Sequence, residues 1–224
     1  MGTRIIGSTI LLTALSTSLL GCAAGDSAAR QNRTPRVLII GDSISIGFFE
    51  PTKQLLAGKA EVYHNAGNAG HTRNGLAQLD AWLGDTPWDV IHFNHGLHDL
   101  KYVDAKGTLV PPDQGTQVMS VDEYAGNLEQ IVKRLKQTRA RLIFATTTPV
   151  PDGAAGRIRG DVERYNRAAL AIMKRYGVRV NDLYAFALPR LASIQQPSNV
   201  HFTEAGSRLL AQQVANSILA ALPK

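Results

Sequence analysis

A serine in a tight turn and a histidine far along the chain are the residues with the clearest chemical potential. Ser43 lies within residues 41–47 (GDSISIG), and His201 lies within residues 199–203 (NVHFT). A serine hydroxyl is a weak nucleophile at neutral pH and needs a nearby base, most often a histidine. Such a pair performs acyl transfer through a covalent intermediate. Taken singly, the serine also fits a simple helix cap, and the histidine fits a side chain packed at a helix start.

Two further segments offer hydrogen-bond donors for a negatively charged oxygen. Residues 65–72 (NAGNAGHT) contain Gly70, and residues 94–99 (NHGLHD) contain Asn94 and His98. Acyl transfer needs such donors because they stabilise the oxyanion of the tetrahedral intermediate. The backbone N–H groups around the serine, at the start of an expected helix, are additional donors. Each segment alone is equally compatible with an ordinary loop or turn.

The serine turn and both donor segments directly follow short apolar runs. Such runs, bounded by glycine or polar residues, are typical of strands buried on both faces of a parallel sheet. Ligands bind at the carboxyl ends of the strands in such sheets, and this is where the three segments would lie. The expected strands are residues 37–40, 61–64, 88–93, 141–145 and 178–180.

Helical periodicity fills the intervals between these strands. Ser120 followed by Glu123 has the spacing of a capping box. Asp161 is expected to cap the next helix, which stops at Gly177, and Thr203 is expected to cap the last. Strands alternating with helices predict a three-layer α/β/α sandwich around a parallel sheet. The periodic apolar positions are Leu76, Leu79, Trp82 and Leu83; Tyr124, Leu128, Ile131, Val132 and Leu135; Val162, Tyr165, Ala169, Ile172 and Met173; and Leu209, Leu210, Val214 and Ile218.

In order and placement, the four segments resemble the four sequence blocks of the GDSL/SGNH hydrolase family, which contribute Ser, Gly, Asn and His. The resemblance covers about residues 36–220. It implies that Ser43 is the nucleophile, Gly70 an oxyanion-hole glycine and His201 the catalytic base. It also implies the SGNH hydrolase fold, a flavodoxin-like parallel sheet of about five strands in the order 2-1-3-4-5. The implied reaction is hydrolysis of carboxylic esters without a cofactor.

The third block departs from the family pattern. It is usually Gly-x-Asn-Asp, but residues 96–99 read GLHD, which is similar to a sub-branch of the family found in exported bacterial proteins. His98 therefore occupies the position of the oxyanion asparagine. A neutral imidazole can donate one hydrogen bond, so His98 can take over this role. Asn94, at the end of the preceding strand, is the alternative amide donor.

The acid that usually orients the catalytic histidine is also missing. The family places an Asp three residues before the histidine, and that position holds Ser198, followed by Asn199. In serine proteases, changing the triad Asp to Asn lowers the rate by about 10⁴, so the orienting group matters. Ser198, Asn199 or a backbone carbonyl is expected to accept the proton on Nδ1 of His201. A catalytically inactive protein is the alternative.

The N-terminus has the features of an export signal. Residues 1–21 combine Arg4 with a long uncharged, mostly apolar run, as in a signal peptide. The run ends before Cys22, the one cysteine of the chain, in a context that resembles a bacterial lipobox. We expect Cys22 to be lipidated, residues 22–35 to form a flexible tether, and residues 36–224 to form the hydrolase domain. The expected location is the outer membrane facing the periplasm, and ordinary secretion is the alternative.

Composition and spacing limit the other partners. The net charge is +6, but the basic residues are spread along the chain, so we expect no nucleic-acid partner. The densest basic group, residues 134–141, is interpreted as the solvated face and end of a helix. His92, His95 and His98 are spaced by three but run from a strand into a loop, so no metal site is expected. We expect a monomer.

Three functions remain open at this stage. The first is hydrolysis of acetyl or short-acyl esters on a small molecule or polysaccharide in the cell envelope. The second is a lysophospholipase or thioesterase with the same mechanism, and the third is an inactive lipoprotein that binds a glycan. Residues 149–160 (PVPDGAAGRIRG) are expected to form a rim over the site. Arg157 and Arg159 there are interpreted as solvated, or as contacts for an anionic or sugar-rich substrate.

Overall fold

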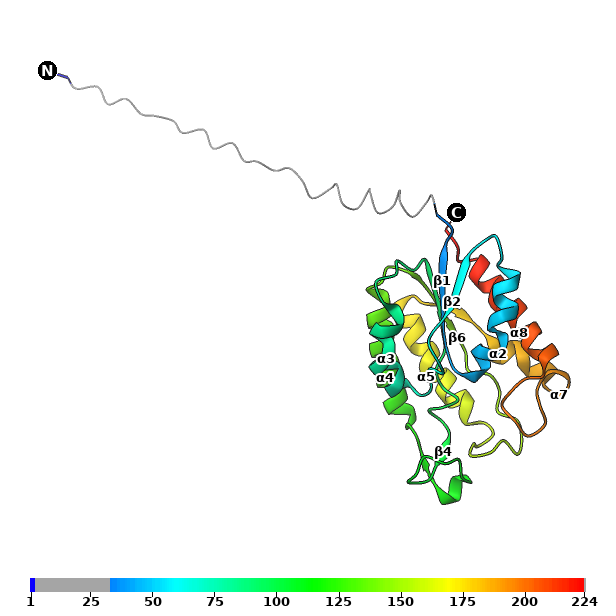
Figure 1. Ribbon diagram of the computed structural model, residues 1–224. Helices are drawn as coiled ribbons and strands as arrows, with labels where there is room; N and C mark the ends of the chain where they lie inside the picture. The colour runs from blue at the N-terminus through cyan, green and yellow to red at the C-terminus, as the bar shows by residue number, and fades with distance from the viewer. Residues whose placement is uncertain (3–32, 224) are drawn as a thin grey trace. The chain divides into compact units, whose positions relative to one another are not determined.

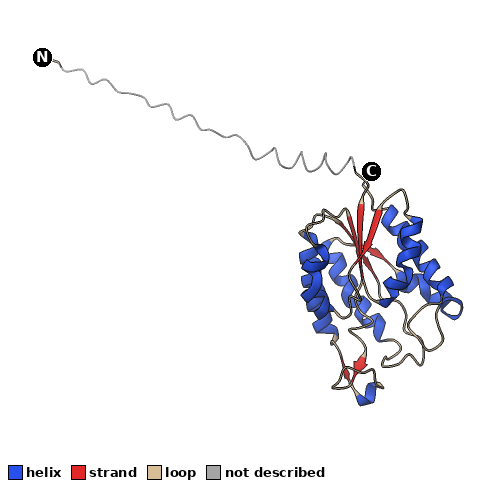
Figure 2. Ribbon diagram, viewed as in Figure 1, coloured by secondary structure: helices blue, strands red, loops and turns tan. Residues whose placement is uncertain are grey.

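A five-stranded parallel sheet forms the centre of the fold. Figures 1 and 2 show helices on both sides of it. The computed structural model describes residues 1–2 and 33–223, and the chain from Thr34 onward forms one compact unit. Strands β1, β3 and β6 are apolar and buried along almost their whole length, as central strands covered on both faces must be. The strands are β1 (Arg36–Ile40), β2 (Glu61–His64), β3 (Val90–Phe93), β6 (Arg141–Ala145) and β7 (Arg179–Asn181), in the order β2-β1-β3-β6-β7.

Helices cover both faces of the sheet and complete the predicted three-layer α/β/α sandwich. Figure 1 shows α2 and α8 on one face and α3, α4 and α5 on the other. The predicted fold class and strand order are therefore confirmed. The helices are α2 (Ser43–Leu55), α3 (Thr72–Leu83), α4 (Val121–Lys136), α5 (Asp161–Tyr176), α6 (Leu183–Ala187), α7 (Leu191–Ile194) and α8 (Glu204–Leu219), with short 3₁₀ turns at Pro112–Gln114 and Leu188–Arg190.

Three of the predicted helix ends are confirmed, and one is wrong. Ser120 and Glu123 form a reciprocal capping box, and the side chain of Thr203 caps α8. Gly177 ends α5 in the left-handed conformation. Asp161, however, is the first helical residue and not the cap, because Gly160 precedes the helix with φ +92°, a conformation that favours glycine.

A small insertion between β3 and α4 was not predicted. It consists of an antiparallel pair, β4 (Tyr102–Val103) and β5 (Thr116–Gln117), which projects beyond the lower end of the sheet in Figures 1 and 2. The backbone N–H of Tyr102 donates to the carbonyl of Gly156 at 2.7 Å, so the insertion is joined to the loop that follows β6. The insertion and the loop that follows β6 lie at the carboxyl end of the sheet, where both line the site described below.

The basic group of residues 134–141 forms local structural contacts. Arg134 pairs with Asp80 at 2.7 Å, and Lys136 donates to the carbonyl of Tyr176 at 3.2 Å. Arg141 donates to the carbonyls of Ala221 and Leu222 at 2.9 and 2.6 Å. Cations at these chain positions satisfy carbonyls left unpaired at the ends of α5 and α8.

The predicted signal peptide, the lipidation site at Cys22 and nearly all of the tether lie outside the described residues. Among the helices that the structure does describe, none combines the length and the apolar character needed to cross a membrane.

Candidate active site

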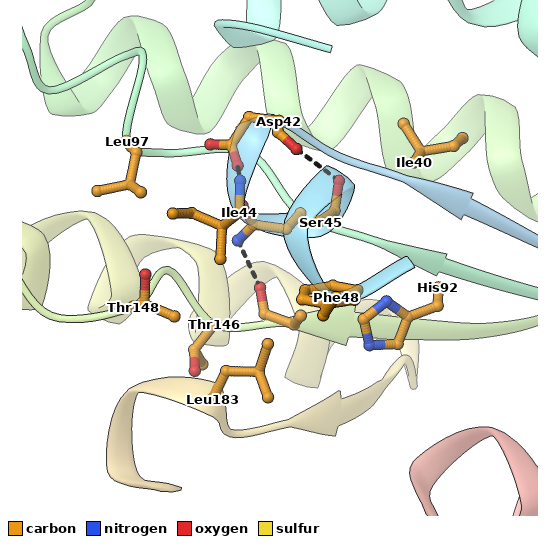
Figure 3. Close-up of a pocket in the computed structure, with 12 residues that line it drawn as sticks. Ile40, Asp42, Ile44, Ser45, Phe48, His92, Leu97, Thr146, Thr148 and Leu183 are labelled. Carbon is orange, nitrogen blue, oxygen red and sulfur yellow. Dashed lines mark hydrogen bonds between the residues drawn. The ribbon is translucent and has the colours of Figure 1, made fainter. Parts of the chain in front are cut away.

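The turn after β1 presents Ser43 at the start of α2. Figure 3 shows how this turn is built: Oδ1 of Asp42 accepts from the N–H of Ile44 at 2.9 Å, and Ser45 Oγ donates to the carbonyl of Asp42 at 2.7 Å. A side chain at Gly41 would put its Cβ 2.7 Å from Ser45 Oγ, so the turn needs glycine there. Ser43 is thus the first residue of α2, where backbone N–H groups lack helical partners.

His201 reaches Ser43 across 158 residues of sequence. Its Nε2 lies 2.8 Å from Ser43 Oγ. Two backbone hydrogen bonds close the loop that carries His201. The N–H of Gln196 donates to the carbonyl of His201 at 2.9 Å, and the N–H of Thr203 donates to the carbonyl of Ile194 at 2.9 Å. The histidine is therefore held at the start of α8, within hydrogen-bond distance of the nucleophile.

Asn199 occupies the other side of the imidazole. Its Oδ1 lies 2.8 Å from His201 Nδ1 and also accepts the backbone N–H of His201 at 3.0 Å. Its Nδ2 donates to Oε1 of Gln196 at 3.2 Å, and this contact fixes which end of the amide faces the ring. Nδ1 of His201 then carries the proton, and Nε2 is left as the acceptor for the serine hydroxyl.

Ser198, the second side-chain candidate for orienting His201, is not the partner of the imidazole. It is exposed and has φ +52°. Its hydroxyl lies beside Gly153 in residues 149–160, which we call the rim loop. The structure therefore brings Ser43, His201 and Asn199 into one chain of hydrogen bonds and leaves Ser198 outside it.

A cavity of about 340 Å³ opens beside Ser43, and we call it the Ser43 cavity. His98 lines it together with Ser43 and His201. The insertion and the rim loop also line it, with two cationic side chains, Lys101 and Arg157. The remaining lining residues are Leu97, Leu109, Ala154, Ala155, Ser198, Asn199 and Val200.

His98 is a neutral hydrogen-bond donor in this cavity. Burial, followed by the charges of Lys101 and Arg157, lowers its pKa to about 3. Lys101 Nζ lies 3.4 Å from His98 Nδ1, and an ammonium group can only donate, so Nδ1 must accept. The ring proton therefore lies on Nε2, which can donate to an oxyanion.

A sequence profile of the GDSL-like lipase/acylhydrolase family matches residues 39–209. The chain belongs to this family. It is therefore an ester-bond hydrolase, and the resemblance predicted from the four blocks is confirmed. A search of curated protein sequences gave no match.

Solved structures of the same fold include esterases of low sequence identity. A lipase/acylhydrolase from Enterococcus faecalis has a TM-score of 0.69 at 19% identity, covering 84% of this chain and 97% of that one. An acetylxylan esterase from Geobacillus stearothermophilus has a TM-score of 0.66 at 20% identity, covering 82% and 94%. A second acetyl xylan esterase has a TM-score of 0.66 at 14% identity, covering 82% and 99%. At these identities the likeness concerns the fold.

Gly70, the family's oxyanion glycine, lies in the predicted loop but does not line the Ser43 cavity. Its N–H donates to Oδ1 of Asn68 at 2.9 Å, and its carbonyl lies 3.1 Å from His95 Nδ1. Asn68 is exposed, so its side chain can rotate away and release the N–H for a substrate. The role of Gly70 therefore stays a prediction that requires this rearrangement.

Asn94, the alternative to His98, does not line the Ser43 cavity. Its amide donates to the carbonyl of Ala145 at 2.7 Å and to Oγ1 of Thr147 at 3.3 Å. Both amide hydrogens are thus used within the protein, and Asn94 lines a much smaller buried pocket below the serine turn. Of the two candidates, His98 is the one placed beside Ser43 and His201.

Asp99 links the second and third sequence blocks, a contact that was not predicted from the sequence. Its Oδ1 accepts from both the N–H and the hydroxyl of Thr72, at 2.9 and 2.6 Å. Burial raises the pKa of Asp99 to about 7. This contact holds the loop of Gly70 against the loop of His98. The sequence indicated it only through the presence of Thr72 in the second block and Asp99 in the third.

The histidines outside the site have structural contacts. His92 is buried and bonded to Asn181 at 3.1 Å, and His95 is buried beside the carbonyl of Gly70. Within residues 33–223, no three His, Cys, Asp or Glu side chains come close enough together to hold a metal ion.

Replacing Asn199 should separate its orienting role from simple packing. We expect Asn199→Ala to lower kcat by about 10², less than the loss of about 10⁴ from changing a triad Asp, because a neutral amide gives the imidazolium no charge stabilisation. Asn199→Asp, in which Gln196 can turn its amide to donate, should retain the wild-type kcat or exceed it. Steady-state hydrolysis of p-nitrophenyl acetate measures both. Wild-type kcat in Asn199→Ala would show that Asn199 does not orient His201.

Proposed function

We propose that this protein removes acetyl or other short acyl groups from carbohydrate esters in the cell envelope. The observation that carries the proposal is the size and lining of the Ser43 cavity. Its volume of about 340 Å³ is at the lower end of the roughly 300–1,000 Å³ typical of small-molecule sites. Polar and charged side chains, including His98, Lys101 and Arg157, line part of it. The fold is also that of two acetylxylan esterases.

The proposed reaction follows from the hydrogen bonds of Ser43. His201 Nε2 accepts the hydroxyl proton as Ser43 Oγ attacks the ester carbonyl carbon. The N–H of Ser43 and the Nε2–H of His98 stabilise the oxyanion, and the N–H of Gly70 joins them once the side chain of Asn68 has released it. His201 then protonates the departing sugar oxygen as the bond between the acyl carbon and that oxygen breaks. Water then attacks the acyl carbon with His201 again as base. The bond between the acyl carbon and Ser43 Oγ breaks, His201 returns the proton to Ser43 Oγ, and the carboxylic acid leaves.

A longer acyl chain is the second candidate. Leu97, Leu109 and Val200 form an apolar wall of the Ser43 cavity, and such a wall favours a lipid or thioester substrate. The limited volume of the cavity argues against a long chain in this position. The non-catalytic alternative has little support, because Ser43 and His201 already lie at hydrogen-bond distance.

The ratio of two model substrates tests the proposal. We expect kcat/KM for p-nitrophenyl acetate to exceed that for p-nitrophenyl octanoate by about tenfold or more. The octanoyl chain does not fit the cavity, so its additional methylene groups contribute no binding energy to the transition state. Ser43→Ala, assayed beside the wild type, gives the background rate. A preference for octanoate would favour the lipid or thioester candidate, and background rates on both esters would contradict the hydrolase proposal.

We also propose that Cys22 anchors the protein to the outer membrane through a lipid. The support is the apolar run before Cys22 and the absence of any other cysteine from the sequence. Partition of the full chain into detergent, lost in Cys22→Ser, is the expected result. Equal partition of the two proteins would contradict the anchor.

A further inference from the structure

Two cationic side chains line the Ser43 cavity without an ionic partner. Lys101 comes from the start of the insertion and Arg157 from the rim loop, and both share the cavity with Ser43 and His201. Among the described residues neither forms an ion pair, whereas Arg159, two positions along the same loop, pairs with Asp152 at 2.7 Å. The loop therefore holds one arginine paired on the surface and another unpaired at the site.

Hydrogen bonds hold both cations at the cavity wall and leave donors unused. Arg157 Nε donates to the carbonyl of Leu97 at 3.3 Å, and its Nη1 donates to that of Ala155 at 3.0 Å. The two hydrogens on Nη2 take no part in these bonds. Lys101 uses one of its three hydrogens toward His98. The guanidinium plane is thus fixed beside the cavity, and fixed donors lose less entropy when they bind a ligand.

The electrostatic surroundings favour an added negative charge. Burial lowers the pKa of both Lys101 and Arg157, and the charge of Arg157 lowers that of Lys101 further. The charge of Asp42 acts on Arg157, but Oδ1 of Asp42 accepts from the N–H of Ile44 at the serine turn. Asp99, which acts on Lys101, is bonded to Thr72. Neither carboxylate bonds to the cations, so the charge of an anion entering the cavity would offset the cost of their burial and reduce their mutual repulsion.

We propose that Lys101 and Arg157 form a subsite for a carboxylate on the alcohol part of the ester, so that the preferred substrates are acetylated acidic carbohydrates in which the sugar is a uronate. The carbohydrate part of this proposal rests on the proposed function. The acetyl carbonyl must lie between Ser43 and the oxyanion donors, which leaves the walls of the cavity for the sugar. An arginine and a lysine with free donors suit a carboxylate, which the guanidinium can bind through two parallel hydrogen bonds.

Matched sugars test the subsite by kinetics. The substrates are the O-acetylated methyl glycosides of glucuronic acid and of glucose, which differ only in the carboxylate. We expect the wild type to show a kcat/KM about tenfold or more higher for the uronide, since charge-assisted hydrogen bonds are stronger than those between neutral groups. In Arg157→Gln this ratio should fall toward one, and in Arg157→Lys it should be partly retained. The matched control is Arg159→Gln, outside the Ser43 cavity, which should keep the wild-type ratio.

Binding to Ser43→Ala gives a readout that does not need turnover. Calorimetric titration should show tighter binding of the acetylated uronide than of the acetylated glucoside, and Ser43→Ala/Arg157→Gln should lose this difference. Equal binding of the two sugars, or a preference that survives Arg157→Gln, would overturn the subsite. Selective uronide binding by a protein that hydrolyses no ester would keep the subsite and reject the proposed function. Equal hydrolysis of both sugars would keep the proposed function and reject the subsite.

Discussion

Replacing Ser43 with alanine is expected to lower kcat for p-nitrophenyl acetate by at least about 10³, and replacing His201 with alanine should have a similar effect. The hydroxyl and the imidazole act as one unit, because the proton moves between Ser43 Oγ and His201 Nε2 across 2.8 Å. In a serine protease, losing either residue costs about 10⁶ in kcat, almost as much as losing the whole triad. The double variant should therefore be no slower than either single variant. Labelling by a fluorophosphonate, with circular dichroism as a check of folding, provides the second measurement.

Ser45 provides a matched control for this prediction. It lies two residues from Ser43 and also contacts a histidine, with its Oγ 2.7 Å from His64 Nε2. However, Ser45 is buried, and its hydroxyl donates to the carbonyl of Asp42. Ser45→Ala should consequently keep fluorophosphonate labelling, although its stability can fall by about 1 kcal/mol from the lost hydrogen bond. If Ser45→Ala loses labelling and Ser43→Ala keeps it, the nucleophile has been assigned to the wrong serine.

The sheet and the position of the site could be predicted because both follow from local patterns. A central parallel strand is apolar along its whole length, so Val37–Ile40 and Leu142–Ala145 are recognisable without any knowledge of their neighbours. The topology of a parallel sheet then places the segments after β1, β2 and β3 at one edge. That is why Ser43 and the His98 segment could be placed together before their contacts were known.

The finer parts of the site depend on contacts that no local pattern records. Ser198 and Asn199 are adjacent polar residues, and the contact with the imidazole is made by Asn199 and not by Ser198, whose backbone is left-handed. The insertion carrying β4 and β5 has no apolar period, and its backbone bond to the rim loop at Gly156 joins segments that are far apart in the sequence. The small pocket that Figure 3 shows below the serine turn likewise combines residues of α2, β3 and β6, among them Phe48 and His92.

Removing the His98 side chain is the second change expected to have a large effect. His98→Ala should lower kcat by about 10²–10³ and change KM little, as loss of one oxyanion donor does in other acyl-transfer enzymes. His98→Asn, which restores the family's usual amide, should keep most of the wild-type kcat because an amide N–H can donate from a similar position. Steady-state kinetics on p-nitrophenyl acetate distinguish these two outcomes.

The pH dependence shows whether His98 acts as a neutral donor or as an acid or base. Because its pKa is lowered to about 3, the imidazole stays neutral over the whole working range, from about pH 5 to pH 9. The ratio of wild-type kcat to His98→Asn kcat should therefore be constant across that range. A ratio that changes with pH would mean that His98 titrates during the reaction. Wild-type kcat in His98→Ala would leave oxyanion stabilisation to the backbone N–H groups of Ser43 and Gly70, and would require the exposed Asn68 to release the latter.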